Sequence, residues 1–200
     1  MFGMCLTATE GGVLDMGFID SSKYVGTMQW VPMRQERYYS LPLVDITIST
    51  TSIGLPAWAY AYNNMQAGSY VDSGAGVMIV SPAIFGGIQA VMQSELPQVP
   101  FVSNQTANIF NGYCPTIAEV SLYWNMFPPI QFVFQTGDGR TGLTLDPPAY
   151  FLTTPDGQHK CFAFTPLGGV GVVFGEPFLQ QFYVAHDLVN SRLGFATQSC

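Results

Sequence analysis

Short runs of alternating apolar and polar residues fill most of the chain, and turn-forming residues separate them. In residues 43–48, LVDITI, the apolar side chains at Val44, Ile46 and Ile48 alternate with polar ones, which is the period of a strand with one buried face. Between residues 11 and 32 turn residues recur as in a β-meander, namely Gly12, Gly17, Gly26 and Pro32. This pattern predicts a sheet protein.

One segment, residues 82–93, has helical spacing instead. Ser81 can cap its first turn and Pro82 suits the first helical position. Residues 94–112 are rich in proline and asparagine and predict a polar connection. Further strands are expected near residues 130–136, 142–146, 149–153, 160–164, 169–174 and 181–196. No shift in composition divides residues 1–200, so we expect one all-β domain with one or two short helices.

The composition agrees with a sheet protein and excludes one class of partner. Apolar residues make up 48% and charged residues 10%, with 21 Gly and 14 Pro, so long polar helix faces are not expected. Lys and Arg total 6 against 13 Asp and Glu, and no window concentrates positive charge. Nucleic acid is therefore not an expected partner.

Membrane and export signals are also not expected within these residues. No stretch reaches the roughly 18 uninterrupted apolar residues of a membrane span. Residues 1–12 lack the basic and apolar regions of a signal peptide. We therefore expect neither a membrane span nor an export signal in residues 1–200.

Four widely spaced cysteines include no C-x-x-C pair, and the sequence permits three pairings of Cys5, Cys114, Cys161 and Cys200. Two disulfides would place the protein in the secretory pathway, extracellular or endolysosomal. Asn104 begins an N-Q-T glycosylation acceptor, which fits the same compartment.

The two histidines, His159 and His186, have no Ser, Cys or second His at the spacing of a catalytic triad or metal site. We expect both at the surface or at strand ends, and we expect no metal or other cofactor. Asp187 and Arg192 are expected to form an ion pair across the final hairpin.

Residues 70–76, YVDSGAG, are the strongest candidate for chemistry. Asp72 follows an apolar residue and precedes Ser73, Gly74 and a further apolar run. The tripeptide alone is ordinary β-turn chemistry. The same turn at the end of a buried strand would also expose a carboxylate. The tripeptide leaves both interpretations open.

The wider context resembles the pepsin-like aspartic proteases. Residues 70–82 are similar to the second active-site loop of that family, hydrophobic-Asp-(Thr/Ser)-Gly followed by an apolar strand and a helix. Residues 171–196 resemble the family's closing segment, and residues 11–33 the meander that opens its C-terminal lobe. The resemblance covers nearly the whole of this chain, which corresponds to only one of the two lobes of such an enzyme. It implies that the chain folds as the C-terminal half of the bilobal β-barrel.

Within the family, the beta-secretase (memapsin) branch is the most similar, through RQERYYSL at residues 34–41, NMFPPI at residues 125–130 and the cysteine positions. This resemblance implies two disulfides, Cys5–Cys200 and Cys114–Cys161. It also implies that a membrane anchor could follow beyond Cys200.

The resemblance implies that Asp72 is a catalytic carboxylate. Family members hold two carboxylates about 3 Å apart that share one proton, so one acts as a base towards water while the other acts as an acid. None of the other aspartates precedes Thr-Gly or Ser-Gly. The second carboxylate would come from an N-terminal lobe absent from this sequence. The substrate would be a peptide or protein.

Roles for the loop residues follow from the same resemblance. Ser73 would bond the opposite loop across the lobe interface. Gly74 would let backbone amides approach the carboxylate. Ala75 stands where Thr or Ser is commoner in the family, and some active relatives carry Ala.

Further residues are expected at the substrate cleft. Tyr38 and Tyr39 match a position that lines subsites on the leaving-group side, and Val173 matches one that faces the cleft. Gly76 is expected beside them. Tyr38, Tyr39 and Val173 fit the core of a sheet equally well.

Two other functions remain open from the sequence. Two copies of the chain could each supply Asp72, as in retroviral proteases with their D-(S/T)-G-A loops. Alternatively, the chain could be a lobe without catalysis that binds peptides. We expect this chain by itself to have almost no protease activity, unless two copies of it form a dimer.

Overall fold

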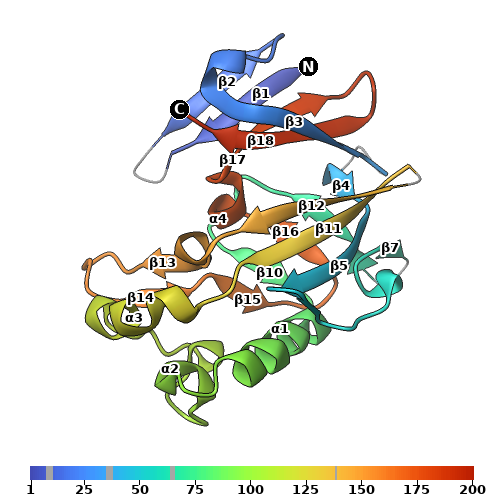
Figure 1. Ribbon diagram of the computed structural model, residues 1–200. Helices are drawn as coiled ribbons and strands as arrows, with labels where there is room; N and C mark the ends of the chain where they lie inside the picture. The colour runs from blue at the N-terminus through green and yellow to red at the C-terminus, as the bar shows by residue number, and fades with distance from the viewer. Residues whose placement is uncertain (8–10, 35–37, 64–65, 138) are drawn as a thin grey trace.

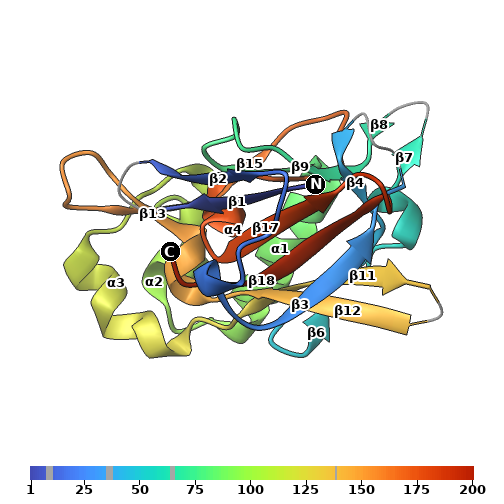
Figure 2. The same cartoon turned by 90° about the horizontal axis from the view of Figure 1, so that it is seen from above.

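The computed structural model describes residues 1–7, 11–34, 38–63, 66–137 and 139–200. A five-stranded antiparallel sheet caps the molecule and contains strands from both ends of the chain (Figures 1 and 2). In spatial order its strands are β2 (Gly12–Met16), β1 (Phe2–Leu6), β17 (Phe182–Asp187), β18 (Arg192–Gln198) and β3 (Tyr24–Pro32). The first and last segments of the chain are thus neighbours in one sheet.

A second five-stranded sheet lies in the body of the molecule below the cap (Figure 1). In spatial order its strands are β15 (Phe164–Pro166), β10 (Met78–Val80), β16 (Val172–Phe174), β9 (Ser69–Val71) and β4 (Ser40–Leu41). Strand β16 pairs in parallel with β9 and antiparallel with β10. The loop between β9 and β10 therefore passes over the end of β16.

The third sheet has four strands. In spatial order they are β12 (Gly139–Leu145), β11 (Ile130–Thr136), β5 (Leu43–Ile48) and β6 (Thr51–Ser52). Ile46 and Ile48 are buried as predicted, but Val44 is half-buried and Leu43 takes the buried position. The prediction for Val44 was wrong because the register of β5 against β11 shifts between Val133 and Phe134. An extra residue in one strand moves the neighbouring side chains to the other face.

Two small hairpins complete the strands, β7 (Tyr62–Asn63) with β8 (Gln66–Ala67) and β13 (Phe151–Thr153) with β14 (Lys160–Phe162). The described α-helices are α1 (Pro82–Glu95), α2 (Pro100–Ser103), α3 (Ile117–Tyr123) and α4 (Glu176–Leu179). The described 3-10 turns span Ser21–Lys23, Ala57–Ala59, Ile109–Asn111, Trp124–Met126 and Pro147–Tyr150. Within the described part of the chain, no helix combines the length and apolar character needed to span a membrane.

The mostly β architecture confirms the predicted fold class. The predicted helix over residues 82–93 is α1, and the Ser81 hydroxyl accepts a hydrogen bond from the Ile84 N–H at 3.3 Å. The expected count of one or two helices was too low, because α2, α3 and α4 are too short to show a helical period.

The connection at residues 94–112 is less polar than predicted. It contains α2 and a 3-10 turn, and Phe101, Val102, Ile109 and Phe110 are buried. Prolines interrupt the apolar spacing of this stretch, so no single period identifies its buried face.

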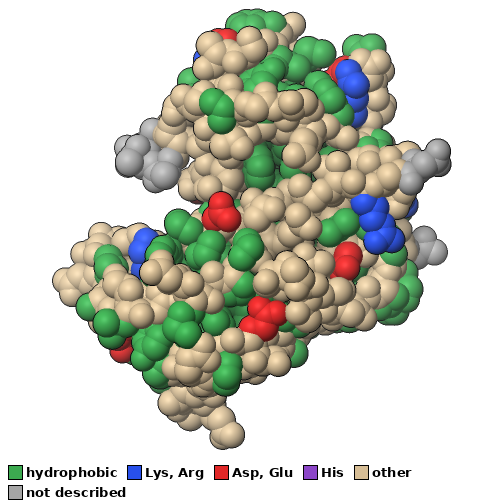
Figure 3. All heavy atoms as spheres, viewed as in Figure 1, with side chains coloured by type: hydrophobic (Ala, Val, Ile, Leu, Met, Phe, Trp, Pro, Cys, Tyr) green, Lys and Arg blue, Asp and Glu red, His purple; other side chains and the backbone are tan. Residues whose placement is uncertain are grey.

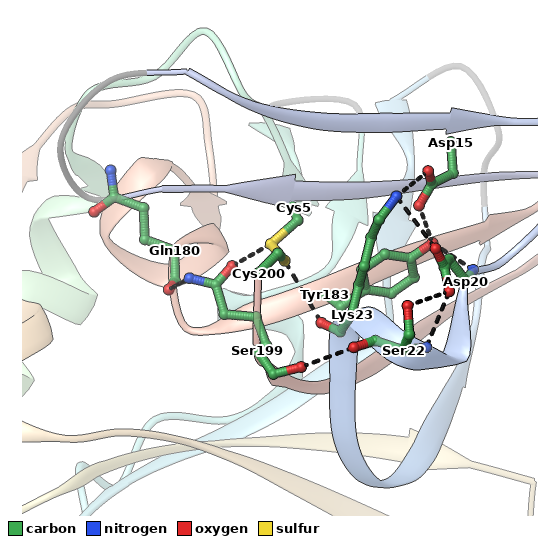
Figure 4. Close-up of a disulfide and its surroundings, with 10 residues drawn as sticks. Cys5, Asp15, Asp20, Ser22, Lys23, Gln180, Tyr183, Ser199 and Cys200 are labelled. Atoms are coloured by element: carbon green, nitrogen blue, oxygen red, sulfur yellow. Dashed lines mark hydrogen bonds and ion pairs between the residues drawn. A yellow bond between two sulfur atoms is a disulfide. The ribbon is translucent and has the colours of Figure 1, made fainter.

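Two disulfides join Cys5 to Cys200 and Cys114 to Cys161, the pairing that the resemblance implies. Figure 4 shows the first beside a partly buried polar cluster in the cap. There the Tyr183 hydroxyl donates to Asp15 at 2.9 Å and accepts from the Asp20 N–H at 3.0 Å, and Lys23 forms an ion pair with Asp15. Hydrogen bonds of Tyr183 thus link β17 to Asp15 of β2 and to Asp20 after it, and the disulfide links β1 to Cys200 after β18.

Charged side chains are sparse at the surface. The face shown in Figure 3 carries a few separate Lys and Arg side chains and no continuous basic patch. Arg192 pairs with the buried Asp187 at 2.8 Å, which confirms the predicted ion pair, and its guanidinium lies 4.0 Å from the ring centroid of Trp30.

Candidate active site

The Asp72 loop is held in place by its backbone. The Asp72 N–H donates to the Phe174 carbonyl at 3.1 Å, and the Ala75 N–H donates to the Asp72 carbonyl at 3.2 Å. The first bond anchors the loop to the end of β16, and the second closes a β-turn. The tripeptide therefore forms a β-turn, and this turn lies directly after the strand β9, which ends at Val71.

The Asp72 side chain is exposed. Its Oδ1 accepts a hydrogen bond from the Gly74 N–H at 2.9 Å. A Cβ atom at Gly74 would lie 3.3 Å from this oxygen, which is a tight contact. A residue without a side chain at position 74 thus lets the backbone amide approach the carboxylate.

Gly175, directly after β16, lies against the same loop. A Cβ atom on it would lie 2.1 Å from the Val77 carbonyl oxygen and 2.4 Å from that of Ala75. The neighbouring Glu176 N–H donates to the Ala75 carbonyl at 2.8 Å. The chain after β16 therefore supports the Asp72 loop through a close backbone contact that requires glycine.

We expect Gly175→Ala to displace the loop and to lower the free energy of unfolding by about 1–3 kcal/mol, the usual range for overpacking. Urea denaturation measures this loss. Gly86→Ala is the matched control, because nothing lies within 4 Å of a Cβ there. That control should raise stability by about 0.5–1 kcal/mol, since it removes a helical glycine. A Gly175→Ala protein as stable as the wild type would contradict the close contact.

A pocket of about 410 Å³ opens beside the carboxylate. It brings four of the predicted site residues together with residues from the cap. Its lining residues are Asp72, Ser73, Tyr38, Tyr39, Tyr70, Val71, Phe2, Met4, Leu179 and His186. The pocket thus lies between the second sheet and the cap, with aromatic walls and a carboxylate at its edge.

The other predicted residues lie outside this lining. Ala75 and Val173 are buried in a small apolar cluster with Val170. Gly76 is exposed, with no atom within 4 Å of a Cβ built on it. Val173 therefore packs in the core, which was the alternative interpretation of this residue.

Tyr70 adds a hydroxyl to the pocket beside Asp72. Its ring centroid lies 5.7 Å from that of Tyr38. Burial raises the pKa of Tyr70, and the negative charge of Asp72 raises it further. The phenol therefore keeps its proton and can donate a hydrogen bond within the pocket.

His186 is the next-to-last residue of β17, so its predicted place at a strand end is correct, but it does not lie at the surface, because it is 3% exposed and lines the same pocket. Every residue of β17 is buried, since the strand lies between β1 and β18 in the cap. The nearly continuous apolar run FYVA before His186 was the signal available in the sequence. Burial lowers the pKa of His186 to about 4, while the Val184 carbonyl acts in the opposite direction.

The lowered pKa of His186 predicts a loss of stability in acid. Between about pH 6.5, its ordinary pKa, and about pH 4, the unfolded chain binds a proton here that the folded chain does not. Stability from this residue is therefore complete above pH 6.5 and falls by up to about 3 kcal/mol as the pH approaches 4.

We expect His186→Phe to remove that part of the pH dependence, as measured by urea denaturation at pH 7 and pH 4. His159→Phe is the control and should leave this part of the pH dependence in place. His159 is only half-buried, and its Nδ1 lies 3.6 Å from Oδ2 of Asp156. If the free energy of unfolding of His186→Phe differed between pH 7 and pH 4 as much as that of the wild type, the buried imidazole would not be the cause of the pH dependence.

No cluster suited to a metal was found in the described ranges, where three or more His, Cys, Asp or Glu side chains do not converge.

Comparison with known proteins decides the family. A family model described as "Eukaryotic aspartyl protease" matches residues 1–198. The chain belongs to this family. Asp72, Ser73 and Gly74 thus lie within the residues that the family model matches.

Individual relatives are similar over nearly the whole of this chain. A beta-secretase of Strongylocentrotus purpuratus is 30% identical over 94% of the chain and 36% of its own length. Gastricsins of Cavia porcellus and Oryctolagus cuniculus are 27% and 26% identical over 98% and 94% of the chain. The chain covers 45% and 43% of those two proteins, so it spans less than half the length of the relatives it matches.

Proposed function

We propose that this chain is the C-terminal lobe of an aspartic endopeptidase and that Asp72 is one of its two catalytic carboxylates. The observation that carries the proposal is the exposed Asp72 side chain, which opens onto the aromatic pocket from a loop fixed to Phe174 and packed on Gly175. A fixed carboxylate at the edge of a pocket can be positioned against a substrate bond.

The proposed reaction is the hydrolysis of a peptide bond. Two carboxylates close together share one proton, because both cannot ionise at that distance. The ionised one takes a proton from water, which attacks the peptide carbonyl, while the protonated one donates a hydrogen bond to the developing oxyanion. Asp72 alone cannot do both, so catalysis requires a second carboxylate.

We propose that an N-terminal lobe supplies that carboxylate. The length of the relatives supports this, since the chain spans less than half of each. The cap supports it as well, because its outer part carries exposed apolar side chains, including Leu14, Met16, Phe18 and Val25, each more than half exposed. Such a surface is typical of a protein contact. The exposed Ser73 hydroxyl would bond the facing loop.

The two disulfides support a location in the secretory pathway, where such bonds form and persist. We propose an extracellular or endolysosomal location. Asn104 is exposed, and its side-chain oxygen accepts a hydrogen bond from the Thr106 N–H at 2.8 Å. We propose that it is glycosylated, which mass spectrometry before and after glycosidase treatment would test.

The intact mass of the native protein, with sequencing of its N-terminus, tests this assembly. We expect a chain about twice as long as this one, with a second Asp-(Thr/Ser)-Gly loop before residue 1. A native chain of 21.8 kDa that forms a dimer would favour two copies of Asp72 in one site. A monomer of that mass that binds peptides without cleaving them would favour a binding module.

A further inference from the structure

Another pocket, of about 300 Å³, lies between α2 and α3, at the end of the molecule opposite the cap (Figure 1). Asn104, the first residue of the N-Q-T acceptor, directly follows α2 and is itself one of the lining residues. The volume is at the lower end of the range of small-molecule sites, about 300–1,000 Å³, so it suits a single sugar ring. The lining also includes Phe101, Tyr113, Glu119, Leu122 and Tyr123.

The oxygen of the Asn104 side chain holds this side chain in one orientation. Oδ1 accepts hydrogen bonds from the Thr106 N–H at 2.8 Å, the Thr106 hydroxyl at 3.0 Å and the Ala107 N–H at 3.1 Å. The residue is exposed, and within the described ranges no group accepts a hydrogen bond from its Nδ2. The amide nitrogen can therefore carry a sugar without the loss of an internal bond.

The pocket offers apolar surface near this nitrogen. Leu122 is 77% exposed, and the half-buried Tyr123 ring lies 5.8 Å from the Phe101 ring between centroids. The faces of aromatic rings are negative and attract C–H groups. One face of an N-acetylglucosamine ring carries its axial C–H groups. That face can cover this surface and remove apolar area from water.

A carboxylate among the lining residues fits the polar groups of the same sugar. Oε2 of Glu119 accepts hydrogen bonds from the Thr116 N–H at 2.7 Å and the Thr116 hydroxyl at 2.8 Å. These bonds hold the pKa of Glu119 below its usual range, so the group is ionised at neutral pH. Oε1 accepts from the Tyr113 hydroxyl at 3.4 Å and keeps a free lone pair. The pocket thus suits a neutral ligand that donates hydrogen bonds.

We propose that the first N-acetylglucosamine of a glycan on Asn104 rests in this pocket. Its C–H face lies on Tyr123 and Leu122, and one of its hydroxyl or amide groups donates to Glu119. The attachment joins Nδ2 of Asn104 to C1 of a sugar carried by a lipid diphosphate, the amide gives up a proton and the lipid diphosphate leaves. This inference rests on the glycosylation proposed above and adds to it a stabilising role for the glycan.

The covalent link makes modest contacts sufficient. A tethered group has a high effective concentration at its site, so the sugar needs no strong affinity of its own. Because α2 and α3 lie away from the cap, a glycan there leaves the proposed lobe contact and the Asp72 pocket open (Figure 1).

The test measures Tm for variants of the protein made at its native length in a secretory host. Thr106→Ser keeps the acceptor sequence, whereas Thr106→Ala removes it. In the Thr106→Ser background, Leu122→Ser should lower Tm by about 2–4 °C, the effect of one ordinary contact in a domain of this size. In the Thr106→Ala background it should change Tm little, because Leu122 then faces water.

Val189→Ser is the matched control. Val189 is also an apolar residue at the surface, 87% exposed, and it lies outside this pocket. Its replacement should have the same effect on Tm in both backgrounds. Equal effects of Leu122→Ser in the two backgrounds would overturn the proposal.

Trimming of the glycan identifies the sugar that makes the contact. An endoglycosidase that leaves one N-acetylglucosamine on Asn104 should preserve the effect of Leu122→Ser on Tm in the Thr106→Ser background. Disappearance of this effect after trimming would assign the contact to the outer sugars and would also overturn the proposal.

The two readouts separate this inference from the proposed enzyme. The mass of the peptide that contains Asn104 reports the glycan, and its absence from the Thr106→Ser protein would overturn both the glycosylation and the place assigned to the sugar. Tm is measured without substrate, so a lack of peptide hydrolysis would count against the proposed endopeptidase alone.

Discussion

Replacing Asp72 by Asn should lower kcat for peptide hydrolysis by about 10³-fold or more in the protein complete with both lobes. General acid–base catalysis contributes typically 10²–10⁴-fold, and an amide can neither take a proton from water nor share one with the second carboxylate. Stability should change little, because the Asp72 side chain is exposed and Asn can still accept from the Gly74 N–H.

A matched control exists in the same chain. Asp156 is also exposed and accepts a hydrogen bond from the N–H two residues later, Gln158, at 3.0 Å, but it lies outside the pocket. Asp156→Asn should retain full activity in the same steady-state assay. If Asp72→Asn remained as active as this control, Asp72 would not be a catalytic residue.

The second large effect concerns the disulfide between β1 and the end of the chain. Replacing Cys5 and Cys200 by Ser should lower the free energy of unfolding by about 5 kcal/mol. The two cysteines are 195 residues apart, so the bond closes nearly the whole chain into a loop and restricts the unfolded state strongly. The cap should loosen first, since this bond joins its first and last segments (Figure 4).

Denaturation in urea under non-reducing conditions measures this loss. The pair Cys114 and Cys161 is the comparison, because it is separated by 47 residues and its replacement should cost about 4 kcal/mol. If replacing Cys5 and Cys200 changed the free energy of unfolding by less than about 1 kcal/mol, the disulfide would not restrict the conformations of the unfolded chain as expected.

Local patterns in the sequence predicted the elements that a single period defines. The strand at residues 130–136 matches β11, and the Ser81 cap and Pro82 locate the start of α1. The position of Asp72 after a strand followed from the apolar residues around it. In each case the signal lies within a few residues of the feature, so no distant contact was needed.

Features that depend on distant contacts were not predictable in this way. Leu43 is buried in place of Val44 because of the register between β5 and β11, and these strands are more than 80 residues apart in the chain. His186 lies beside the Asp72 pocket because β17 pairs with β1 and brings it against Phe2. The isolated sequence around His186 shows neither partner.

The pH dependence of peptide hydrolysis by the two-lobe protein tests most directly whether Asp72 works as half of a shared-proton pair. We expect kcat/KM to follow a bell-shaped curve with its maximum in acid, because one carboxylate must be ionised and the other protonated. The two apparent pKa values would belong to the pair. A rate that is negligible in acid and rises to a plateau near neutral pH would contradict a pair of carboxylates and the role assigned to Asp72.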